Sequence, residues 1–90
     1  MKVVWTIPAD EDREKIISFI AQDNLDAALE IDDLFTSVTN SLEKFPLRGF
    51  VGRENNSREL VVHRNYIIVY GIDGDIIYIK SVLHTSRQYP

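Results

Sequence analysis

Hydrophobic and polar residues follow two periods along this chain, helical in the first half and strand-like in the second. The opening run KVVWTI (2–7) is rich in β-branched and aromatic residues, which predicts a short strand. Pro8 then indicates the first turn of a helix, where its missing N–H would have no partner in any case. Apolar residues four positions apart, such as Ile16 and Ile20, predict that this helix continues until the polar residues QDN (22–24) end it.

A second helix is predicted from Leu25 to Lys44, because its apolar residues recur at steps of three and four. These residues are Ala27, Ala28, Ile31, Phe35, Val38, Leu42 and Phe45, with Leu34 alongside them. Pro46 ends the pattern. Two helices joined by a short polar turn form an antiparallel hairpin, which we therefore expect in the first half of the chain.

The second half of the chain has the pattern of a β-meander. PLRGFVGRENNS (46–57) contains two glycines and two asparagines and is predicted to be a loop. Asp-Gly in DGD (73–75) is a strong hairpin-turn signal, and HRN (63–65) predicts a second tight turn. These two turns separate three predicted strands, RELVV (58–62), YIIVYGI (66–72) and IIYIKSVLH (76–84).

The resulting order is β-α-α-β-β-β, which predicts a two-layer α+β fold. The first strand cannot bury its apolar face alone, so we expect it to join the three later strands in a four-stranded, mainly antiparallel sheet. The N-terminal helical hairpin should pack on one side of that sheet. The chain has 90 residues and contains no repeat or interdomain linker, so residues 1–90 are expected to form one domain.

The composition narrows the possible chemistry. The chain has no cysteine, which excludes disulfides, thiolate catalysis and cysteine-ligated zinc, and which fits a reducing cytoplasm. The apolar run before the first acidic residues is too short for a signal peptide or a membrane span. We therefore expect a cytoplasmic protein with no membrane partner. His63 and His84 are the two histidines, and without a third ligand they are a weak zinc site, so neither a metal nor a cofactor is expected.

The formal net charge of −4 is unevenly distributed. Residues 1–46 carry ten acidic and four basic side chains, whereas residues 47–90 carry four acidic and six basic ones. Any surface that binds anions must therefore come from the second half. The acidic cluster DEDREK (10–15) lies in a predicted first helical turn, and the helix dipole explains acidic residues there without a catalytic role.

The sequence resembles the toxins of the RelE/ParE superfamily, the toxin halves of bacterial type II toxin–antitoxin pairs. The resemblance covers nearly the whole chain and is carried by FIAQDNLDAALEIDDLF, FPLRGFVGR, RELVVHRNYIIVYGIDGD and VLHTSRQYP. It implies the order of elements predicted above and a cognate antitoxin whose C-terminal segment wraps the toxin in a hetero-oligomer. RelE-like members cut messenger RNA on the ribosome, whereas ParE-like members poison DNA gyrase.

The resemblance to RelE-like nucleases makes His84, Arg87 and Tyr89 candidate catalytic residues. Cleavage without a metal needs a base, an acid and cations that stabilise the charge on the phosphorane. Tyr89 falls where the C-terminal tyrosine of the RelE pattern falls. Thr85 and Ile67, however, occupy the two positions where that pattern has arginines. Paired histidines are an alternative source of acid and base, and the contrasting interpretation is that both histidines are solvated.

Arginines of the second half are candidate binding residues for phosphate or for an acidic protein surface. They are Arg53, Arg58, Arg64 and Arg87, and Arg48 belongs to the same group. The contrasting interpretation is that they are ordinary solvated charges on loops and strand ends.

Three functional hypotheses remain, and they differ in the target of the toxin. We prefer a ParE-like toxin that inhibits growth by binding a protein such as DNA gyrase and is neutralised by its antitoxin. The alternative is an enzyme, a metal-independent, ribosome-dependent mRNA interferase. The acidic second helix disfavours it, because ribosomal RNA would repel that helix. The third hypothesis is a degenerate toxin that retains only antitoxin binding.

Overall fold

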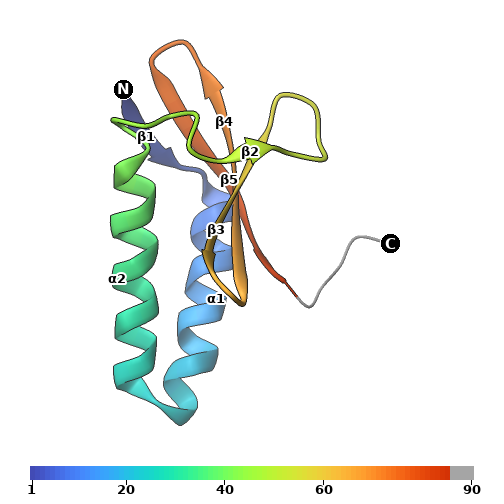
Figure 1. Ribbon diagram of the computed structural model, residues 1–90. Coiled ribbons are helices and arrows are strands. Elements are labelled where there is room, and N and C mark those ends of the chain that lie inside the picture. Colours follow the sequence, from blue (N-terminus) through green and yellow to red (C-terminus); the bar gives the residue numbers. More distant parts are fainter. Residues whose placement is uncertain (86–90) are drawn as a thin grey trace.

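The computed structural model describes residues 1–85, which have the expected α+β fold and a sheet of five strands (Figure 1). The elements are β1 (Lys2–Trp5), α1 (Ile7–Asp23), α2 (Leu25–Ser41), β2 (Phe50–Val51), β3 (Arg58–His63), β4 (Tyr66–Asp73) and β5 (Ile76–His84). The strand count differs from the four expected, because Phe50 and Val51 form a short strand inside the predicted loop 46–57.

Thr6 ends β1 and begins α1. Its side-chain oxygen accepts a hydrogen bond from the backbone N–H of Ala9 at 3.3 Å, which caps the helix. The same hydroxyl donates to the carbonyl of Ile79 at 2.7 Å and so ties the junction to β5. The strand is therefore shorter than the predicted range 2–7, and the helix begins one residue before Pro8.

The two helices form the expected hairpin, with Asn24 as the capping residue between them. The Asn24 side chain accepts from the backbone N–H of Ala27 at 3.0 Å. Helix α2 ends at Ser41, earlier than the predicted Lys44, and continues in tight turns in which Leu42 N–H donates to the carbonyl of Thr39. Neither helix of the described chain is long and apolar enough to cross a membrane.

Arg13 joins the two helices. Its guanidinium donates to Oδ1 and to the main-chain carbonyl of Asp32, both at 2.8 Å, and to Oγ1 of Thr36 at 2.6 Å. The same group lies 4.7 Å from the ring centroid of Trp5 and 5.7 Å from that of Phe35. One side chain thus combines hydrogen bonds with cation–π contacts at the base of the hairpin.

The sheet has the strand order β1-β5-β4-β3-β2. β1 pairs in parallel with β5, and every other neighbouring pair is antiparallel, so the sheet is mainly antiparallel as predicted. Pairing between β4 and β5 passes from Val69–Ser81 to Tyr70–Ile79, which makes Lys80 the extra residue of a β-bulge. Gly74 has a φ of +59° in the turn between these strands, which explains the DGD signal.

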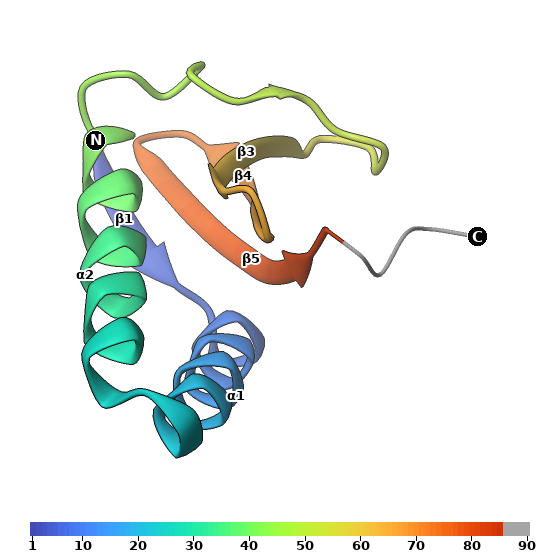
Figure 2. The ribbon, with the colours of Figure 1, turned by 60° about the horizontal axis from the view of Figure 1, so that its bottom comes forward.

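The helical hairpin covers one side of the sheet, and the core lies between these two layers (Figure 2). Tyr66, Ile68 and Tyr70 alternate along β4 and point toward the helices. The other buried residues of this cluster are Ala9, Phe35, Leu42, Leu60, Ile77, Ile79 and Val82. Trp5 is partly buried and packs against this cluster.

Candidate functional site

Three rings meet where β3 ends, β4 begins and β5 ends. The ring centroid of Tyr66 lies 6.1 Å from that of His63 and 5.2 Å from that of His84. The turn between β3 and β4 is fixed by two main-chain N–H donors. Asn65 N–H donates to the side-chain Nδ1 of His63, and Thr85 N–H donates to the carbonyl of Asn65. The fold therefore places both histidines of the sequence beside one buried tyrosine.

A cavity of about 510 Å³ lies beside these rings, between α1 and the end of β5. It is lined by Asp12, Lys15, Ile16, Phe19, Tyr66, Val82 and His84. Asp12 accepts a hydrogen bond from the backbone N–H of Val82 at 3.0 Å, so its carboxylate is already engaged next to the β-bulge. Lys15 is the one lysine or arginine among the described lining residues.

The two positions that would carry arginine in a RelE-like nuclease have other roles here. Thr85 donates its hydroxyl hydrogen to the carbonyl of Arg64 at 2.9 Å, and Ile67 pairs with Leu83 inside the sheet. The candidate catalytic residues Arg87 and Tyr89 lie outside the described residues. In the part of the chain that the structure covers, no three His, Cys, Asp or Glu side chains gather as a metal site would require.

The candidate binding arginines that the structure describes do not form one cluster. Arg58 opens β3 and donates to the carbonyl of Gly49 at 2.7 Å. Arg53 lies 3.7 Å from the carboxylate of Glu59, on the same end of the sheet. Arg64 follows the other end of the six-residue strand β3, and a rise of about 3.3 Å per residue separates it from Arg58 by roughly 20 Å.

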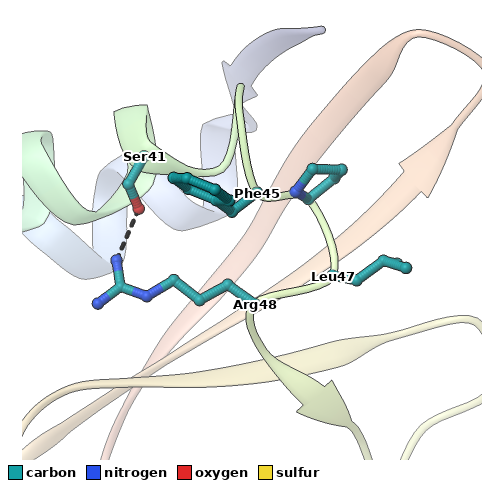
Figure 3. Close-up of a pocket in the computed structure, with 5 residues that line it drawn as sticks. Ser41, Phe45, Leu47 and Arg48 are labelled. Atoms are coloured by element: carbon teal, nitrogen blue, oxygen red, sulfur yellow. Dashed lines mark hydrogen bonds between the residues drawn. The ribbon is translucent and has the colours of Figure 1, made fainter.

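The most exposed apolar side chains near the sheet belong to the connecting segment, residues 45–57 between α2 and β3. Phe45, Leu47, Phe50 and Val51, here called the apolar patch, are all exposed. Beside them is a cavity of about 650 Å³ lined by Ser41, Phe45, Pro46, Leu47 and Arg48 (Figure 3). Arg48 donates from Nη1 to Oγ of Ser41 at 2.7 Å, which holds its guanidinium beside this cavity (Figure 3).

The connecting segment is tied to the sheet by buried polar groups. The hydroxyl of Tyr70 donates to the carbonyl of Pro46 at 2.8 Å and accepts from the N–H of Gly49 at 2.9 Å. Gly49 approaches so closely that a Cβ there would lie 2.8 Å from Glu59 O and from the Tyr70 ring. Glu59, itself buried, accepts from the N–H of Arg53 at 3.1 Å. The apolar patch is thus presented on a backbone fixed at several points.

Sequence reasoning did not predict this patch. It classified residues 46–57 as a loop because of their glycines and asparagines. The missed signal was the run FPLRGFV, in which four large apolar residues fall without helical or strand period. Such residues cannot all face one core, so some of them had to be exposed.

Three comparisons relate this chain to known proteins. A family profile described as the ParE toxin of the type II toxin–antitoxin system parDE matches residues 3–89. The candidate toxin Y4kP of Sinorhizobium fredii is 32% identical over 90 residues, with 99% of this chain and 93% of that protein covered.

The solved structures have lower identity and a similar fold. A chain of the chromosomal ParDE toxin–antitoxin system of P. aeruginosa superposes with a TM-score of 0.83 and 18% identity, over 93% of this chain and 95% of its own. A copper-bound mutant toxin of Helicobacter pylori gives a TM-score of 0.68 and 14% identity, over 99% of both chains. At these identities the structural likeness concerns the fold alone.

Proposed function

This chain belongs to the ParE toxin family of type II toxin–antitoxin systems, and we propose that it inhibits growth by binding a protein target, DNA gyrase. A cognate antitoxin neutralises it in a toxin–antitoxin hetero-oligomer. Family membership implies the antitoxin, whereas the choice of target depends on the residues themselves.

The observation that supports a protein target is that Lys15 is the one lysine or arginine among the described residues lining the cavity beside the Tyr66–His84 pair. A phosphoryl transition state needs fixed cations around its oxygens. The described lining of the neighbouring cavity offers Lys15, which shares that lining with the carboxylate of Asp12. Thr85 and Ile67 are uncharged and engaged elsewhere. This arrangement is a poor fit to RNA cleavage and leaves protein binding as the better explanation.

The charge of α2 supports the same target. Its sequence LDAALEIDDLFTSVTNS carries four acidic side chains, Asp26, Glu30, Asp32 and Asp33, and no basic one. Of these four, Asp32 forms an ion pair with Arg13. A surface of this sign is repelled by ribosomal RNA within a Debye length of about 8 Å at physiological salt. A protein target imposes no such penalty.

The antitoxin is expected to lie on the helical hairpin and the adjoining edge of the sheet. Phe19, Leu25 and Leu29 are exposed apolar residues of α1 and α2, and we call them the hairpin surface. β1 is the edge strand on the side of the sheet opposite β2, and its outer main-chain groups can pair with an added strand. A disordered antitoxin segment that folds on these two features would cover them both.

Purified protein incubated with gyrase, relaxed plasmid and ATP tests the target. We expect supercoiling to fall and linear DNA to appear after protein digestion, because a gyrase poison traps the cleaved complex. A parallel reaction with translating ribosomes and a reporter transcript tests the alternative. Transcripts that are cut while plasmid topology stays normal would overturn the proposal in favour of an mRNA interferase. Intact transcripts and normal topology, with unharmed growth on expression, would indicate a degenerate toxin.

The mRNA interferase stays the second candidate because of the His63–Tyr66–His84 cluster. Rings at 5.2 and 6.1 Å beside a cavity could supply an acid and a base. If transcripts are cut, His84→Gln should abolish cutting, and Arg87→Ala and Tyr89→Phe should each reduce it. Cutting that survives His84→Gln would exclude this site.

A further inference from the structure

The side chains of the apolar patch are more than half exposed, as those of a docking surface are before its partner binds. Leu47 is 64% exposed, and Phe50 and Val51 are 57% and 77% exposed. Successive residues of a strand point to opposite faces, so exposure of both Phe50 and Val51 means that neither face of β2 is covered. The backbone beneath them is fixed by Tyr70 and Arg58. Little ordering is therefore needed when a partner binds.

The connecting segment is also the basic part of an acidic molecule. Residues 45–57 carry two basic side chains, Arg48 and Arg53, and one acidic side chain, Glu54, and they are flanked by Lys44 and Arg58 together with Glu43 and Glu59. Residues 1–43 carry ten acidic and three basic ones. Arg48 lies beside the apolar cavity of about 650 Å³, with its guanidinium held by Ser41 (Figure 3). The chemistry of this surface thus complements an apolar side chain that stands next to a carboxylate.

β2 offers main-chain groups as well. Gly52 N–H donates to the carbonyl of Ser57, and Phe50 and Val51 pair with Glu59 and Arg58 in the same register. Pairs alternate along an antiparallel ladder, so the N–H and C=O of Val51 point away from β3. β2 is the last strand of the sheet order on this side, and these groups therefore face outward.

We propose that the connecting segment is the surface that binds the target protein, through an acidic segment with apolar side chains that adds a strand beside β2. This inference rests on the proposed function, because it requires a protein target. The hairpin surface remains with the antitoxin. A second copy of this chain is disfavoured as the occupant, because a symmetric contact would bring together two copies of a segment with net positive charge.

Binding of two synthetic peptides tests the chemistry of the surface. The first is a fluorescein-labelled octapeptide of alternating leucine and glutamate, and the second has lysine in place of each glutamate. We expect the full-length protein to bind the glutamate peptide about tenfold more tightly than the lysine peptide in fluorescence anisotropy. Arg48→Glu and Leu47→Asp should each weaken binding of the glutamate peptide by about tenfold.

Two matched variants control for net charge and for lost apolar area. Lys15→Glu makes the same change of charge as Arg48→Glu on an exposed residue of α1. Ile7→Asp removes a side chain that is 76% exposed, at a helix start where an acidic residue is favourable. Both should bind the glutamate peptide as the unmodified protein does. Equal binding of the two peptides, no binding of either, or equal losses in the control variants would overturn the inference.

Gyrase assays with the same variants separate this inference from the proposed function. If gyrase is inhibited by the unmodified protein and equally by Arg48→Glu and Leu47→Asp, the inference fails and the proposed function stands. If the unmodified protein leaves gyrase unaffected, the proposed function fails, and the assignment of the surface to that target fails with it. If Arg48→Glu and Leu47→Asp alone lose inhibition of gyrase, with unchanged circular dichroism, the result supports the proposed function and this inference together.

Discussion

Tyr70 is the residue on which the position of the connecting segment depends most. Its ring is fully buried in the core, and its hydroxyl bonds to Pro46 and Gly49 of that segment. Tyr70→Phe should lower the free energy of unfolding by about 1–3 kcal/mol, because it leaves the buried N–H of Gly49 and the half-buried carbonyl of Pro46 without their partner. Urea denaturation followed by circular dichroism measures this change.

Tyr78→Phe is the matched control, since Tyr78 is a half-buried residue of β5 outside this network. It should change the free energy of unfolding by no more than about 0.5 kcal/mol. Equal effects of the two substitutions would show that the Tyr70 hydroxyl contributes nothing specific.

At the residue scale, the sequence was a better guide to which residues could carry chemistry than to which residues contact one another in the fold. His63 and His84 were both singled out from their types, and the fold brings them to Tyr66. The role of Tyr70 could not be predicted, because its hydrogen-bond partners lie 21 and 24 positions away in the chain. Arg87 and Tyr89 remain predictions.

At the scale of secondary structure, the packing of α1 against α2 depends on Arg13. Arg13→Ala removes three hydrogen bonds to α2 and the contacts with Trp5 and Phe35. The partner carboxylate is 42% exposed, so solvent screens the ion pair and we expect a loss of about 1–2 kcal/mol in the free energy of unfolding. Thermal and urea unfolding both measure it.

Lys15→Ala controls for the loss of a positive charge from the same helix. It should be neutral to within about 0.5 kcal/mol, because Lys15 is an exposed residue. Arg13→Lys should recover only part of the loss, since an ammonium group cannot reproduce the planar arrangement of donors. A full recovery by lysine would contradict the importance of that geometry.

Elements with a clear period were predicted well, and those without one were not. The range of β5 follows from the alternation of its residues. The starts of the two helices follow from Pro8 and from the polar residues before Leu25. Helix α2 ends before the predicted Lys44 because the N–H groups of Leu42, Glu43 and Lys44 donate to carbonyls three residues back, in tight turns rather than α-helix. β2 was missed because two residues are too few to show a period.

Antitoxin binding should change the behaviour of the whole molecule toward proteases. We expect trypsin to digest the free toxin about tenfold faster than the complex with its cognate antitoxin, because binding to the folded state suppresses opening of the hairpin. Time courses on gels measure both rates. An antitoxin that lacks its C-terminal segment is the control and should protect poorly. Equal digestion of free and bound toxin would contradict coverage of the hairpin surface.

The α+β architecture followed from the order of elements, whereas the strand neighbours did not. Local sequence shows that residues 2–5 form a strand with an apolar face, and it predicts that this strand joins the sheet. It gives no register, because pairing of Lys2 with Ile76 joins opposite ends of the chain. Long-range pairing of this kind is decided by the packed molecule.

The parallel pairing of β1 with β5 has a consequence for the timing of synthesis. β5 lies between β1 and β4 and packs against α1, yet the ribosome makes it after every other described element. In a nascent chain that lacks β5, β1 has no strand to pair with and α1 has no sheet strand to pack against. This fold therefore forms only after translation has passed residue 84. Until that point the nascent chain lacks the packed sheet on which every surface described above depends.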